Sequence, residues 1–77
     1  MIMNDLNWSI YFVKLEFSSG EIKYIQDSAG VFTDNLKSAK IFKTRLNAQK
    51  IADIYNRNWS DRKASVVEVQ LFEVTKE

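Results

Sequence analysis

The sequence predicts a single α+β domain of order β-β-β-α-β, in which an antiparallel-rich sheet of three or four strands carries one helix on one face. Three observations predict it: alternating apolar residues over 8–17, a helical period over 45–58 and a second alternation over 65–75. The 77-residue chain contains no Pro and no repeat, and its length suits one domain. Residues 1–7 precede the first predicted element and are expected to be disordered or to form an arm.

The first predicted strand, residues 8–17, is apolar at every second position: Tyr11, Val13, Leu15 and Phe17. This period of two indicates a strand with one buried face. The opposite face is also apolar in its first half, at Trp8, Ile10 and Phe12. A tight turn at 18–20, with Gly20 in the left-handed conformation, then leads into a second strand at 21–26. We therefore expect an antiparallel hairpin.

Residues 27–38 have the composition of a loop, with turn residues near both ends. Val31, Phe32 and Leu36 are apolar anchors that should hold this loop against the body of the domain. A short third strand is predicted at 39–43, where Ile41 and Phe42 form an apolar pair.

The helix is predicted from about Arg45 to Asn58, with Thr44 as its N-cap. One arc of about 100° carries its apolar side chains, as expected for a helix packed on a sheet: Ala48, Ile51, Ala52, Tyr55 and Trp59. Leu46 projects to the polar side, and Asp53 can pair with Arg57 one turn later.

The last strand is predicted at 65–75. Its alternation changes parity after Leu71, which indicates either a β-bulge near that residue or burial on both faces. If the helix crosses back over the sheet, this strand lies beside the first one and parallel to it, with a right-handed crossover.

Four short segments, Trp8–Lys14, Lys23–Ile25, Phe32–Leu36 and Ala39–Thr44 followed by the helix, resemble small uncharacterised proteins of phages and prophages of Gram-positive bacteria. Asn47 stands where those proteins usually have Glu, on the helix surface. The resemblance implies a phage accessory protein that binds and modulates a host or defence component. It assigns no activity and no functional residue.

The sequence contains few of the residue combinations that enzymes use for catalysis. The chain has no Cys and no His, which excludes disulfides, thiolate zinc sites and imidazole ligands. Its carboxylates are scattered singly and its two glycines are isolated, so no acid–base pair or phosphate-binding loop is evident. Asp27, Asp34 and Asn35 are explained better by turn chemistry than by a divalent ion. We expect a non-enzymatic protein without cofactor or metal.

The sequence shows no signal peptide and no apolar stretch of membrane-spanning length. The expected location is therefore the cytoplasm of the bacterial host cell, without a membrane partner.

Charge is unevenly distributed, although the net charge is only +1. Residues 37–63 contain eight basic and two acidic side chains. The candidates for contact with phosphates or with an acidic partner are Lys37, Lys40, Lys43, Arg45, Lys50 and Arg57. If they cluster, they would bind nucleic acid in a salt-dependent manner. The alternative is a solvated polar face, which the low net charge favours.

The second candidate surface is apolar. If the helix covers the face that carries Val13 and Leu15, the other face exposes a set of apolar side chains: Trp8, Ile10, Phe12 and Phe72. Exposed apolar patches usually mark interfaces. The N-terminal segment or loop 27–38 can instead cover them, and a homodimer can use the same patch.

The apolar surface favours a non-enzymatic binding protein, and the resemblance implies that it is a phage or prophage accessory protein that binds and modulates or inhibits a host or defence protein, in its most specific form in the manner of anti-CRISPR proteins. The alternatives are a nucleic-acid-binding regulator that uses the basic segment from Lys37 to Arg57, and a structural or dimeric phage accessory protein.

Overall fold

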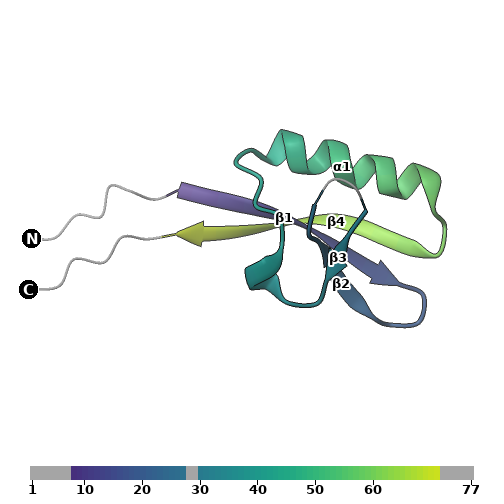
Figure 1. The fold of residues 1–77 in the computed structure, drawn as a ribbon. Helices are drawn as coiled ribbons and strands as arrows, with labels where there is room; N and C mark the ends of the chain where they lie inside the picture. Colours follow the sequence, from purple (N-terminus) through teal and green to yellow (C-terminus); the bar gives the residue numbers. More distant parts are fainter. Residues whose placement is uncertain (1–7, 28–29, 72–77) are drawn as a thin grey trace, which may run out of the picture.

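The computed structural model describes residues 8–27 and 30–71. They form a four-stranded antiparallel sheet of order β3-β2-β1-β4 with one helix packed on one face, which confirms the predicted fold class (Figure 1). The elements in chain order are β1 (Trp8–Phe17), β2 (Ile22–Ile25), β3 (Phe32–Thr33), the 3₁₀ helix η1 (Leu36–Ser38), α1 (Arg45–Asn58) and β4 (Arg62–Leu71).

The β1–β2 hairpin forms where the sequence predicts it. The Gly20 N–H donates to the Phe17 carbonyl at 2.8 Å, and the Phe17 N–H donates to the Glu21 carbonyl at 2.9 Å. Gly20 has a φ of 94°, a conformation that costs a residue with a Cβ more than it costs glycine. Its position therefore fixes the turn and, through it, the pairing of Lys14 with Tyr24.

The third strand is not where the sequence predicts it. β3 comprises Phe32 and Thr33, which pair with Ile25 and Tyr24, whereas residues 39–43 make only one bridge, between Phe42 and Tyr11. The physical reason is that this segment passes from one strand to another. The Lys40 N–H donates to the carbonyl of Ile25 at the end of β2, and two residues later Phe42 exchanges backbone bonds with β1.

The helix α1 has the predicted bounds and cap. The Thr44 hydroxyl oxygen accepts a hydrogen bond from the Asn47 N–H at 3.2 Å, which satisfies a donor of the first turn. Leu46 is 65% exposed, as its place on the polar side predicts. The predicted pairing of Asp53 with Arg57 is wrong: Asp53 accepts a hydrogen bond from Gln49, and no ion pair with Arg57 occurs among the described residues.

The last strand lies beside β1, as expected, but runs antiparallel to it, so the parallel arrangement is wrong. The reason is the path of α1. Its first residue, Arg45, lies over the Tyr11 ring, and the chain reaches the other end of β1 where the Ser18 N–H bonds the Asp61 carbonyl. Fourteen helical residues span about 21 Å, the length of that stretch of β1. β4 must therefore return in the opposite direction.

β4 begins three residues earlier than predicted, at Arg62, and its register with β1 is unbroken to Leu71. No bulge interrupts this described part of the strand. The predicted parity change concerns residues 72–75, which lie outside the described residues.

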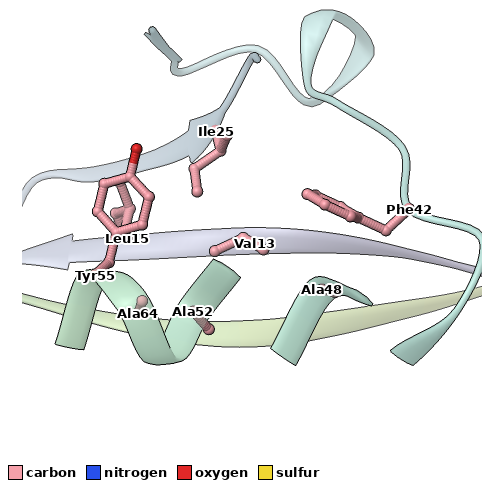
Figure 2. Packing of buried hydrophobic residues seen from close by; sticks show 8 residues of the cluster. All are labelled: Val13, Leu15, Ile25, Phe42, Ala48, Ala52, Tyr55 and Ala64. Carbon is pink, nitrogen blue, oxygen red and sulfur yellow. The ribbon is translucent and has the colours of Figure 1, made fainter. Parts of the chain in front are cut away.

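The core lies between the sheet and α1 (Figure 2). Its members are Val13, Leu15, Ile25, Phe42, Ala48, Ala52, Tyr55 and Ala64. Three of them are alanines where helix and sheet face each other, which lets the backbones approach closely. Of the predicted loop anchors, Phe32 packs against this core, while Val31 is exposed.

Candidate functional site

The sheet face opposite α1, called here the open face, is largely apolar. Ile10 pairs with Val69 and Phe12 with Val67, and directly paired residues project to the same side of a sheet. η1 lies on this side, away from α1 (Figure 1), and Ile41 of the segment after it also reaches the open face. The apolar side chains of the open face are Ile10, Phe12, Ile22, Tyr24, Leu36, Ile41, Val67, Val69 and Leu71.

A shallow groove of about 250 Å³ lies on the open face. Its lining comprises Ile10, Phe12, Leu36, Lys37, Ile41 and Val69. Phe12 forms part of the floor and is only 5% exposed, whereas Ile41 at the rim is 54% exposed. The loop predicted as an alternative cover therefore walls the groove with Leu36 and Lys37 rather than closing it.

Two of the four predicted apolar contact residues, Ile10 and Phe12, meet in this groove. Trp8 is the first residue of β1 and pairs with Leu71, but its side chain is not among those described. Phe72 lies outside the described residues. Leu36 and Ile41 at the rim were not predicted as groove residues. Periodicity relates residues within one element, and it does not show which loop lies against which strand.

The predicted basic residues do not form one patch. Lys37 lines the groove on the open face, whereas Lys50 and Arg57 are exposed on α1, which covers the other face. Lys40 lies over the Phe42 ring at 5.6 Å, and Lys43 is exposed before the helix. A phosphate backbone on one side of the domain could not contact all of them.

Arg45, the sixth basic candidate, is engaged within the domain. Its Nη2 lies 2.9 Å from Glu68 Oε1, and its guanidinium group lies 5.4 Å from the centroid of the Tyr11 ring. Hydrogen bonds from Ser9 and Arg45 hold the pKa of Glu68 below its ordinary value. The pair joins the start of α1 to β4.

A larger cleft of about 490 Å³, which the sequence did not predict, opens beside the end of α1. Its lining is mainly apolar and comprises Gly30, Phe32, Ile51, Ile54, Tyr55, Trp59 and Arg62. Tyr55 stacks on Trp59 with 5.0 Å between ring centroids, and Phe32 meets Tyr55 edge-on at 6.0 Å. The sequence assigns these residues to a loop and a helix arc, and no local signal brings them together.

Arg62 lies at the wall of this aromatic cleft. Its guanidinium carbon is 4.8 Å from the Phe17 ring centroid and 5.2 Å from that of Trp59. Its Nε and Nη2 donate to the two carboxylate oxygens of Asp61, at 3.0 and 3.3 Å. The hydrogen bond from Arg62 lowers the pKa of Asp61, and burial raises the pKa of Tyr55. Tyr55 therefore keeps its proton at neutral pH, and the charge of Arg62 is matched by that of Asp61.

Within residues 8–27 and 30–71, no group of three or more carboxylates is placed to hold a metal ion. The Asn35 side chain instead accepts a hydrogen bond from the Lys37 N–H at 3.0 Å at the start of η1. None of the described helices has the length and apolar character needed to cross a membrane.

A scan against protein-family models found no match to this chain, and searches of curated proteins and of solved structures also found none.

Proposed function

We propose that this chain is a non-enzymatic binding domain that docks a partner protein on its open face. The observation that supports the proposal is the continuous apolar surface that β1 and β4 form around the groove. Large apolar surfaces with a polar rim are typical of protein interfaces. The groove would receive an apolar side chain of the partner, and the Lys37 amine at its edge would meet an acidic group.

The distribution of charge supports a protein partner over nucleic acid. Binding to a nucleic-acid backbone requires several cations that follow a line of phosphates. Of the predicted candidates, Lys37 lies on the open face, whereas Lys50 and Arg57 lie on α1, on the other face. Strand parity adds Lys14 and Lys63 to the open face, but both lie toward the other end of β1 from Ile10, and Lys63 is directly opposite Glu16. An apolar groove with one amine suits a protein surface better.

The resemblance to small phage and prophage proteins suggests the biological form of this binding. We propose a host or defence protein as the partner, inhibited because the domain covers one of its working surfaces. Inhibition of a bacterial defence nuclease complex, in the manner of anti-CRISPR proteins, is the most specific form of the proposal. A structural role in a phage particle is the alternative that the same surface would serve.

The test compares two exposed aliphatic residues on opposite faces. Ile41 is 54% exposed at the groove, and Leu46 is exposed on the polar side of α1. Tagged wild-type protein, Ile41→Asp and Leu46→Asp are used for capture from a lysate of a Gram-positive host, with and without nuclease. The proposal expects one protein that survives nuclease treatment, is retained by Leu46→Asp and is lost with Ile41→Asp.

Two results would overturn the proposal. The first is equal retention of the captured protein by both variants when both are folded by circular dichroism. The second is recovery of nucleic acid with protein that disappears after nuclease treatment, which would favour the basic residues instead.

A further inference from the structure

β4 is an outer strand of the sheet, and half of its backbone groups point away from β1. The odd-numbered residues of β1 bond toward the hairpin side, as Tyr11 does with Phe42 and Phe17 does with Glu21. Its even-numbered residues therefore bond toward β4, where they pair with odd-numbered residues such as Ser65 and Val67. The N–H and C=O groups of the even-numbered β4 residues consequently point outward.

One of these outward positions already has a partner. Ala64 donates its N–H to Asn56 Oδ1 at 2.8 Å, and its carbonyl accepts a hydrogen bond from Asn56 Nδ2 at 3.0 Å. The side-chain amide of α1 thus takes the place of a neighbouring strand. Among the hydrogen bonds of the described residues, none uses the outward groups of Val66, Glu68 or Gln70. The free edge of β4 is therefore the stretch 66–70.

We propose that this free edge pairs with the same edge of a second copy of the chain, antiparallel and around a twofold axis at Val69. In this register Glu68 of each copy lies opposite Gln70 of the other, and the two residues exchange backbone hydrogen bonds. Val69 lies opposite its own counterpart, and Val67 lies opposite Leu71. The two sheets then form one continuous sheet with both open faces on the same side.

Two features of the edge favour this register over the neighbouring ones at Val66, Val67 and Glu68. An axis at Val67 would place Gln70 opposite Ala64 of the other copy, and an axis at Val66 would place Glu68 there. In both cases Asn56 already occupies the backbone groups of Ala64. An axis at Glu68 would place two carboxylates directly opposite each other, an arrangement that destabilises a strand pair. An axis at Val69 avoids both, and it pairs a carboxylate with an amide and apolar residues with apolar residues. The edge is therefore complementary to itself, which favours a second copy of the chain as the partner, because a twofold interface uses the same surface on both partners.

The inference is independent of the proposed function, because it concerns the edge of the sheet and not its open face. Pairing of two copies would double the apolar surface that a partner protein could contact, but the two copies can pair without a partner protein. The purified chain alone is sufficient for the test, so failure of one proposal leaves the other standing.

Because the chain contains no cysteine, single-cysteine variants report the register directly. In the proposed dimer the two Val69 Cα atoms are about 4.5 Å apart, within the range of a disulfide. The two Val67 Cα atoms are offset by four residues, about 13 Å along the strand, which is too far. We therefore expect Val69→Cys to form a covalent dimer on mild oxidation, and Val67→Cys and Leu71→Cys to form one only when mixed with each other.

Charge variants test the same pairing without a cross-link. Gln70→Lys places an amine opposite Glu68 of the other copy and should tighten the dimer, while Gln70→Glu should weaken it, each by a factor on the order of ten. Gln26→Lys and Gln26→Glu, at an exposed residue just after β2, are the matched controls and should leave the dissociation constant unchanged. Sedimentation velocity over a concentration series measures the dissociation constant of the dimer for each variant.

The inference is overturned if the wild-type chain sediments as a monomer at all concentrations and Val69→Cys does not cross-link. It is also overturned if Val67→Cys or Leu71→Cys cross-links alone as readily as Val69→Cys, or if the Gln70 and Gln26 variants shift the dimer equally.

Discussion

The side-chain amide of Asn56 pairs with both backbone groups of Ala64, at 2.8 and 3.0 Å, and so ties the last turns of α1 to the outer edge of β4. An asparagine amide has the same donor and acceptor as a peptide group, which is why it can stand in for a strand. Ala64 is buried, and without Asn56 its N–H and carbonyl would lose their partners.

We expect Asn56→Ala to lower the free energy of unfolding by about 1–3 kcal/mol, because it leaves two backbone groups of a buried residue unsatisfied. Urea denaturation with an unchanged slope measures the loss. Asn58→Ala is the control in the same helix, since its amide bonds only the exposed Ile54 carbonyl. Equal stability of the two variants would show that the pairing with Ala64 contributes nothing specific.

The start of α1 depends on Thr44. Thr44→Ala removes the side-chain acceptor for the Asn47 N–H and should destabilise the fold by about 1 kcal/mol, whereas Thr44→Ser keeps the acceptor and should recover most of that loss. Thermal unfolding followed by circular dichroism distinguishes the two. A serine variant no better than the alanine variant would contradict the role of the cap.

Truncation to alanine should cost much more stability at Leu15 than at Leu46. Leu15 is fully buried between sheet and helix, and Leu15→Ala should cost about 2–5 kcal/mol. Leu46 is exposed on the outer side of α1, and Leu46→Ala should change stability by less than about 0.5 kcal/mol. Chemical denaturation compares the pair. A large loss for Leu46→Ala would mean that this leucine is covered in solution.

Acid should weaken the link between α1 and β4. The folded-state pKa of Glu68 is lowered, so its contribution to stability is present above the unfolded-state pKa and is lost as pH falls through the folded-state value. We expect Glu68→Gln to be less stable than wild type at neutral pH and to converge with it as the pH falls through the lowered folded-state pKa of Glu68. Glu16→Gln is the control, because the Glu16 carboxylate has no ion pair among those of the described residues. Melting curves over a pH series at low salt measure the difference, and parallel pH profiles for Glu68→Gln and wild type would refute it.

The elements that were predicted correctly have local signals. Thr44 followed by a helical period predicts α1, and Gly20 between two alternating strands predicts the hairpin. The errors concern arrangement rather than pattern. Ile41 and Phe42 suggest a strand, but the chain there crosses from β2 to β1, and nothing in that segment reveals the crossing.

For the site, too, features with a local sequence pattern could be predicted, whereas features that depend on how distant segments come together could not. Ile10 and Phe12 could be assigned to the open face, because strand parity alone separates them from Val13 and Leu15. The basic residues could not be placed, because spacing along the chain does not show that Lys37 and Lys50 lie on opposite sides of the sheet. The aromatic cleft was missed for a related reason: Phe32 reaches Tyr55 only through the pairing of β3 with β2.

The helix α1 is fastened to β4 at two points, by Arg45 to Glu68 and by Asn56 to Ala64. These contacts are eleven residues apart, about 16 Å along the helix axis. Two anchors at that separation resist sliding and pivoting of the helix over the sheet, so α1 and β4 should keep their relative positions when a partner binds the open face. A partner would then associate with little loss of conformational entropy in these two elements, and the heat capacity change on binding should contain no contribution from their folding.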